Sequence, residues 1–257
     1  KQRASVQQSV QALDRAGIPV YYTPGNHDIG DNPDAKTLAQ YTRTSGDNPG
    51  WGPLFQRVLD KNGILYLQFN SQVYWSTDSF LDKHREEQLE FLKSEVGRIQ
   101  SDVKRLVLLT HIPPFMDSID EKEGWANWKQ VYRRQILDLL ATPKVPMLWV
   151  CGHFHANVVK DLTYQDVPLS IRVSSAAGTT MQWDGKDELS PRDAQEVASK
   201  DIANAFAQDI GFSNIPERLK AEGDRSGLRI FRIDEGDGSF EDRWYTLDEL
   251  DDVQTTS

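Results

Sequence analysis

Apolar residues recur along the chain in short runs that are bounded by turn or helix signals. The clearest runs are Ile18 to Tyr22, Ile64 to Asn70, Arg105 to Leu109 and Pro146 to Val150. Runs of this length, rich in β-branched and aliphatic residues, are typical of buried β-strands. We therefore predict four strands, of which the first, third and fourth have the character of parallel strands.

Between these runs the spacing of apolar residues changes to that of helices. Helices are predicted at about Ser5 to Ala16, Leu54 to Lys61, Asp82 to Gln100 and Trp128 to Ala141. In the third helix the apolar positions fall on one face. The alternation of strand and helix predicts an α/β layer architecture.

In the C-terminal half, the predicted strands no longer alternate with helices. Strands near Leu169 to Ser174, Leu228 to Ile233 and Arg243 to Thr246 suggest hairpins and a second sheet. An acidic, helix-prone insertion lies at about residues 183–225, and it is either a lid or a surface elaboration. We expect residues 1–257 to form a single domain that carries this insertion.

The charge and the cysteine content bear on which partners and which cellular location to expect. The net charge is -10 and the pI is near 5.0, so binding to nucleic acid or to anionic lipid is not expected. The apolar stretches are too short for membrane insertion. Cys151 is the only cysteine and cannot form an internal disulfide, which favours a reducing, cytoplasmic location. The sequence opens directly into a helical pattern, so an upstream targeting peptide stays possible.

The histidines cluster. Four of the five occur in three short motifs that follow predicted strands: Gly25-Asn26-His27-Asp28, Thr110-His111-Ile112-Pro113-Pro114 and Gly152-His153-Phe154-His155. In α/β sheets the loops beyond the carboxyl ends of the strands meet at one edge. The motifs therefore predict a shared metal site and an enzyme.

Imidazole and amide groups are good ligands for borderline divalent metals. Asn26, His111 and His153 form one plausible ligand set, and His155 would serve a neighbouring ion. His27 should point away from the ion and donate a proton to a leaving oxygen. Asp28 either orients that imidazole or is a turn residue.

Other polar residues have plainer interpretations. His84 lies among charges at the start of a predicted helix, so we expect a solvated side chain. Cys151 is expected to be a small buried thiol. The acids after Pro114 are expected to face solvent: Asp117, Asp120, Glu121 and Glu123.

The three motifs closely resemble the calcineurin-like metallophosphoesterase superfamily, in which Gly-Asn-His-Asp/Glu, a central His and Gly-His-x-His hold two metals. The stretches GNHDIGDNP, FNSQVYW, HIPPFMDSIDE, GHFHANV, VSSAAG and WYTLDEL resemble a serine/threonine phosphatase branch of that superfamily. The resemblance implies an α/β (α+β) fold, a four-layer α/β/β/α sandwich. It also implies two divalent or transition metal ions, with Mn, Fe, Zn or Mg as candidates.

The resemblance also assigns roles. Asn26, His111 and His153 would bind the second metal, His155 the first, and His27 would act in catalysis. The implied reaction is attack on a phosphomonoester by a hydroxide held between two ions, with phosphoserine or phosphothreonine in proteins as substrate. Two alternatives stay open: a phosphodiesterase on small diesters such as cyclic nucleotides, and a non-catalytic structural subunit that keeps the fold.

One departure from the superfamily pattern concerns the region before Gly25. The Asp-x-His and Gly-Asp-x-x-Asp motifs that supply the other ligands have no match there. We therefore expect the fold to lack its N-terminal strands here, with the natural protein continuing upstream. These 257 residues alone are expected to be inactive or weakly active. The exposed N-terminal sheet edge or the insertion 183–225 could bind a protein partner.

Overall fold

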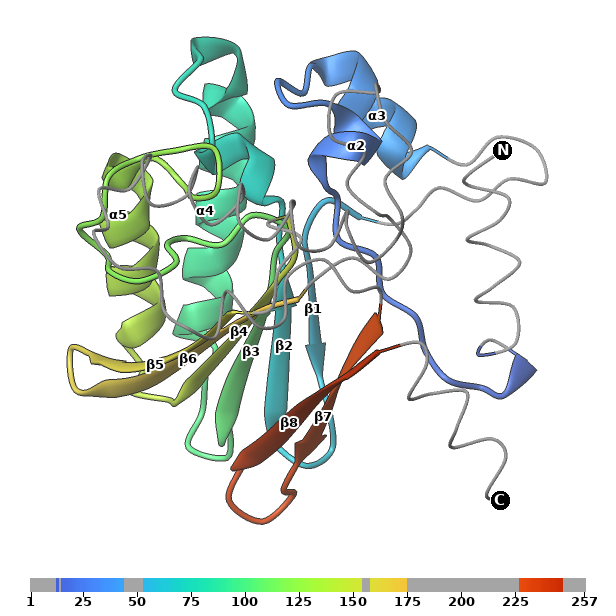
Figure 1. Cartoon of the computed structure of the whole chain (residues 1–257), viewed down its shortest axis with the longest axis vertical. Helices are drawn as coiled ribbons and strands as arrows, with labels where there is room; N and C mark the ends of the chain where they lie inside the picture. The colour runs from blue at the N-terminus through green and yellow to red at the C-terminus, as the bar shows by residue number, and fades with distance from the viewer. Residues whose placement is uncertain (1–12, 14, 44–52, 154–157, 175–226, 247–257) are drawn as a thin grey trace, which may run out of the picture.

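The centre of the molecule is a six-stranded mixed sheet (Figure 1). The computed structural model describes residues 13, 15–43, 53–153, 158–174 and 227–246. The sheet has the strand order β1-β2-β3-β4-β6-β5. Its strands are β1 Gln56–Leu59, β2 Ile64–Gln68, β3 Arg105–Leu109, β4 Met147–Cys151, β5 Val158–Tyr164 and β6 Val167–Val173. β2, β3, β4 and β6 are parallel, and β1 and β5 pair antiparallel at the two edges.

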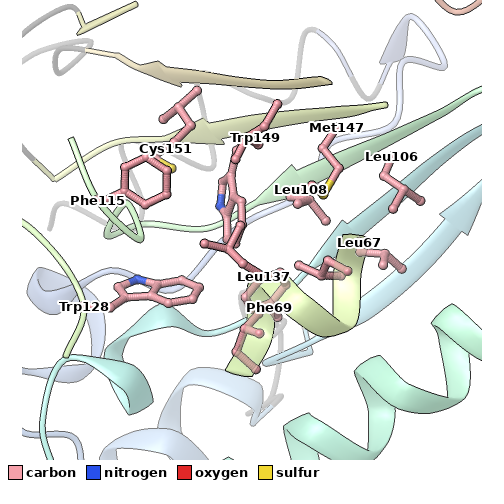
Figure 2. Packing of buried hydrophobic residues seen from close by; sticks show 14 of the residues in the cluster. Leu67, Phe69, Leu106, Leu108, Phe115, Trp128, Leu137, Met147, Trp149 and Cys151 are labelled. Carbon is pink, nitrogen blue, oxygen red and sulfur yellow. The ribbon is translucent and has the colours of Figure 1, made fainter. Parts of the chain in front are cut away.

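Helices α4 (Asp82–Gly97) and α5 (Gln130–Ala141) cover one face of this sheet (Figure 1). Two short 3-10 helices, η1 (Ser71–Tyr74) and η2 (Ser79–Leu81), lead into α4. Figure 2 shows the core under the helices, where Leu108, Trp149 and Leu137 are fully buried. Burial of aromatic and aliphatic surface here is the main stabilising term for the layer.

The second sheet is the hairpin of β7 (Gly227–Ile233) and β8 (Phe240–Thr246). It packs on the opposite face of the six-stranded sheet, where Val107 and Leu148 meet Phe231 and Phe240. The described residues therefore form helix, sheet and sheet layers. The expected α/β sandwich is confirmed, with three of its four layers inside the described residues.

Ile18 to Tyr22 is not a strand, so that prediction was wrong. The segment is extended but makes no ladder pairing with described residues, and Ile18 and Tyr21 are about half exposed. It borders an apolar cavity of about 680 Å³ that Tyr66 and Phe231 also line. A run of apolar residues becomes a strand only where a neighbouring strand offers hydrogen-bond partners.

The predicted helix at Leu54 to Lys61 was also wrong. Its central part is strand β1, which turns back into β2 at Asn62 and Gly63. Gly63 has φ 84°, and the Asp60 carboxylate accepts hydrogen bonds from the backbone N–H groups of Asn62 and Ile64. An Asn-Gly pair between apolar residues is a strong hairpin signal, and it overrides weak helical spacing.

The other predicted elements that lie within the described residues agree with the structure, apart from the following differences. Leu169 to Ser174 lies in β6 and belongs to the first sheet rather than the second. Strand β5 and the helices α2 (Asn26–Ile29) and α3 (Ala35–Thr42) were not predicted. α3 has Asp34 as its N-cap, which accepts from the Thr37 N–H at 2.7 Å.

Some predictions concern residues outside the described part of the chain. These are most of the helix from Ser5 to Ala16, the insertion 183–225 and His155. Among the residues that are described, no helix has both the length and the apolar character needed to cross a bilayer.

Candidate metal centre

The ends of two adjacent parallel strands bring His111 and His153 together. β3 and β4 are paired up to Leu109 and Val150. Pairing continues beyond the strands, because the Gly152 N–H donates to the His111 carbonyl at 2.9 Å. The two imidazole rings lie 5.0 Å apart between centroids, in an edge-on arrangement. The expected convergence of these two motifs is confirmed.

Asn26 joins them from a different part of the chain. It is the first residue of α2, and Gly25 is the N-cap. A Cβ atom at Gly25 would lie 2.9 Å from Nδ1 of His111, so any larger residue would push against the imidazole. Glycine at position 25 therefore allows the α2 segment to approach the sheet edge closely.

Three potential ligand atoms face one another at this edge. Nε2 of His111 lies 2.9 Å from Oδ1 of Asn26 and 3.2 Å from Nδ1 of His153. No group of three or more His, Cys, Asp or Glu side chains converges among the described residues, so the amide of Asn26 is essential to the set. The site is half-buried at all three positions.

The hydrogen bonds assign the tautomer of His153. Its Nε2 lies 2.8 Å from the backbone carbonyl of Trp125, which can only accept, so Nε2 carries the proton. Nδ1 then presents its lone pair toward His111 and Asn26. His153 has a positive φ of 69°, a left-handed conformation that is uncommon outside glycine. Such strain clusters at functional sites.

The donor set fits a divalent metal ion. Metal bonds to imidazole nitrogen or amide oxygen of about 2.0–2.2 Å, at angles near 90–109°, place neighbouring ligand atoms roughly 2.8–3.6 Å apart. The two measured separations, 2.9 and 3.2 Å, lie in this range. A backbone carbonyl that accepts from the remote nitrogen of a ligating histidine is the usual support for such a ligand.

His27 and Asp28 lie beside this cluster on α2, and both are exposed. The Asp28 carboxylate accepts a hydrogen bond from the Gly25 N–H at 3.0 Å. This contact caps the short helix, which supports the interpretation of Asp28 as a turn residue. Its role in orienting His27 stays a prediction, as does the proton transfer by His27.

Two groups that support the site were missed by sequence reasoning. Asp31 accepts from Nδ2 of Asn26 at 2.9 Å and so turns Oδ1 of that amide toward His111. The other is the Trp125 carbonyl. A backbone carbonyl can belong to any residue, so the sequence does not indicate it. The role of Asp31 depends on the turn after α2, which brings its carboxylate to Asn26.

The loop between β3 and α5 carries Trp125 and is held by a buried carboxylate. Glu121 accepts from the backbone N–H groups of Met116 and Asp117 at 2.8 Å each, and from Nδ2 of Asn127 at 2.6 Å. The prediction that Glu121 faces solvent was wrong, since it is only 7% exposed. Clusters of backbone N–H groups attract a carboxylate into the loop.

A polar pocket of about 400 Å³ lies next to the metal-binding cluster. Trp75, Trp125 and Lys129 are among the residues that line it. The indole edge of Trp125 packs against the His153 ring at 5.6 Å between centroids, so the pocket and the cluster share a wall. The ammonium group of Lys129 lies 3.3 Å from Glu123.

Cys151 and His84 agree with their plain interpretations. Cys151 is buried at the end of β4, and its burial raises the pKa of the thiol to about 12. His84 lies at the start of α4 and contacts the Glu87 carboxylate at 3.6 Å. We find no catalytic geometry around either residue within the part of the chain that the structure describes.

Comparison with known proteins identifies the family of this chain. The model of the calcineurin-like phosphoesterase family matches residues 2–157, which include all three histidine motifs. The chain belongs to this family. The calcineurin-like phosphoesterase match covers the six-stranded sheet through β4 but ends before β5.

Curated relatives in the family are similar over most of this chain. The serine/threonine-protein phosphatase CPPED1 of Homo sapiens is 30% identical over 216 residues, which are 81% of this chain and 62% of that protein. CPPED1 of Mus musculus is 28% identical over 222 residues, 86% of this chain and 66% of that protein. The chain thus spans less than two-thirds of the length of these relatives.

Among solved structures, a dimetal phosphatase from Danio rerio is similar with a TM-score of 0.44 and 12% identity, over 67% of this chain and 66% of that chain. A purple acid phosphatase from yellow lupin seeds has a TM-score of 0.40 and 14% identity, over 64% of this chain and 32% of that chain.

Proposed function

We propose that the protein is a metal-dependent phosphoesterase that hydrolyses phosphomonoesters, with phosphoserine and phosphothreonine in proteins as its substrates. The observation that carries this proposal is the convergence of Oδ1 of Asn26, Nε2 of His111 and Nδ1 of His153 at one sheet edge. Family membership supports the reaction type. The proposed substrate class is that of the curated relatives, which are serine/threonine-protein phosphatases.

Each residue of the site has a proposed task. Asn26, His111 and His153 hold one divalent ion, and His155 contributes to a second. When bound, such ions supply Lewis-acid charge for phosphoryl transfer and lower the pKa of water. His27 donates a proton from its imidazole to the departing oxygen. The part of the substrate beyond the phosphoryl group lies in the pocket beside Trp75 and Trp125.

The proposal includes the cellular compartment, the metal and the surfaces that contact a partner. With a single buried cysteine, we place it in a reducing compartment such as the cytoplasm. Metal identity among Mn, Fe, Zn and Mg depends on cellular supply as much as on the ligands. The insertion 183–225 and the exposed N-terminal edge of the sheet are the proposed contacts for a protein partner.

A matched pair of histidine substitutions tests the function. In the natural full-length protein, His111→Ala should remove one metal ligand and lower turnover of p-nitrophenyl phosphate by at least about 100-fold. His84→Ala, which removes a histidine on α4 that lies 3.6 Å from Glu87, should leave turnover unchanged. Metal content by inductively coupled plasma mass spectrometry should fall only in the first variant.

The same assay separates the alternatives. Faster turnover of p-nitrophenyl phosphate than of bis-p-nitrophenyl phosphate supports the phosphomonoesterase, and the reverse order would support a phosphodiesterase. A wild-type protein that turns over neither ester would leave the structural-subunit hypothesis in place. Equal turnover in wild type and His111→Ala would contradict the assigned metal site.

A further inference from the structure

The backbone carbonyl of Trp125 accepts two hydrogen bonds from side chains that are far apart in the sequence. One comes from Nε2 of His153 at 2.8 Å and the other from the indole Nε1 of Trp75 at 3.0 Å. Trp75 lies directly after η1, fifty residues before Trp125 in the sequence. The carbonyl thus connects a residue next to the helical layer with a histidine at the sheet edge.

This carbonyl determines how His153 faces the metal-binding cluster. A hydrogen bond at Nε2 leaves Nδ1 unprotonated in the neutral ring and directed at His111. The Trp125 indole also packs against the ring at 60° between planes, which restricts rotation. If the carbonyl moved, the proton could transfer to Nδ1 and the ligand atom would be lost.

Trp75 is the side chain that holds the carbonyl from the other side. Trp125 lies in an irregular loop that forms no strand or helix, and loops of this kind move more than the elements they connect. The indole of Trp75 is half-buried, and its N–H donates to the Trp125 carbonyl at 3.0 Å. Nearby, Glu121 and Asn127 fix the preceding part of the same loop.

We propose that Trp75 is a positioning residue for the metal site: it fixes the Trp125 carbonyl, which holds His153 with Nδ1 available to a divalent ion. The inference rests on the metal binding in the proposed function but not on its substrate. Trp75 and Trp125 also line the polar pocket, so a substrate there would contact the residues that orient His153.

The test is Trp75→Phe, which keeps an aromatic ring and removes the indole N–H together with the five-membered ring. We expect Zn²⁺ affinity of the full chain, measured by competition with a fluorescent chelator, to fall about 10-fold or more, the usual effect of losing such support. Nitrogen NMR of His153 should show a loss of the pure Nε2–H tautomer. In the active protein kcat should also fall, whereas KM does not test the proposal, because Trp75 lines the pocket proposed for the substrate.

Trp244→Phe is the matched control. The Nε1 atom of Trp244 is buried and has no hydrogen-bond partner among the described residues, so removing it should not change Zn²⁺ affinity. Equal affinities of the two variants would overturn the proposal. Trp75→Gln, which keeps an N–H donor without the ring, is the second variant and decides the matter if Trp75→Phe does not fold: retained affinity supports the hydrogen bond, and lost affinity overturns it.

The outcomes also separate this inference from the proposed function. A wild-type protein that binds Zn²⁺ and shows the Trp75 effect, but hydrolyses no phosphoester, refutes the function and keeps the positioning role. If the wild-type protein is active but Trp75→Phe and Trp244→Phe bind Zn²⁺ equally well, the proposed function is kept and the positioning role is refuted. A wild type that binds no metal overturns both.

Discussion

Single residues determine whether the three motifs can meet. Gly25 lacks the Cβ atom that would press on the His111 ring, and Asp31 turns the Asn26 amide so that its oxygen faces the histidines. His153 adopts a left-handed backbone conformation, and its ring lies against that of His111. The ligand types were predictable from the sequence, because histidines after strands are conspicuous. Their supporting contacts were not, since these depend on backbone atoms and on one turn.

His27 offers a residue-scale test of proton transfer. If it protonates the leaving oxygen, His27→Ala should lower kcat for phenyl phosphate by about 100-fold or more, but much less for p-nitrophenyl phosphate. The reason is that p-nitrophenolate leaves readily without a proton, whereas phenolate is more basic. The measurement is kcat for both esters in the wild-type, His27→Ala and His84→Ala proteins. An equal loss on both esters would assign His27 a role other than proton donation.

At the scale of elements, prediction succeeded for segments whose hydrophobic pattern fits only one kind of element. β3 agrees residue for residue with the predicted strand Arg105 to Leu109, and α4 and α5 begin within two residues of prediction. Buried parallel strands and amphipathic helices have strong periodic signals. Ile18 to Tyr22 has the same strand signal but no pairing partner in the described residues, and local sequence cannot show whether a partner is present.

The β1–β2 hairpin shows a turn signal that should have outweighed helical spacing. Gly63 has a positive φ, and a Cβ atom there would lie 2.3 Å from the Asp102 carbonyl oxygen. Gly63→Ala should therefore destabilise the protein by about 2 kcal/mol or more, since the left-handed conformation and the clash with backbone both oppose it. Urea unfolding followed by circular dichroism measures the change.

Gly97 provides the control for that substitution. It is the last residue of α4, and a Cβ atom there would meet nothing within 4 Å. Gly97→Ala should leave stability unchanged or raise it by about 0.5–1 kcal/mol, because alanine restricts the unfolded chain and favours helix. If both alanine variants unfold at the same urea concentration, the backbone argument for the hairpin turn fails.

At the scale of the whole molecule, the two sheets are joined by charge as well as by apolar packing. The Asp242 carboxylate on β8 accepts a hydrogen bond from Nε of Arg172 on β6 at 2.7 Å and another from Nη1 of Arg229 on β7. The side chains of all three residues are at most 10% exposed. The carboxylate therefore balances two buried guanidinium groups between the layers.

Asp242→Asn should destabilise the protein by about 3–5 kcal/mol, because it removes the buried negative charge that Arg172 and Arg229 share. Asp161→Asn is the comparison: Asp161 also pairs with Arg172, at 2.9 Å, but its side chain is 60% exposed, so the loss should stay within about 1 kcal/mol. Urea unfolding of both variants gives the two values. The hairpin of β7 and β8 covers the sheet that carries His111 and His153. If Asp242→Asn separates the hairpin from this sheet, the Zn²⁺ affinity of the variant should also fall. Two variants of equal stability would show that the buried Asp242 pairs contribute no more than the exposed Asp161 pair.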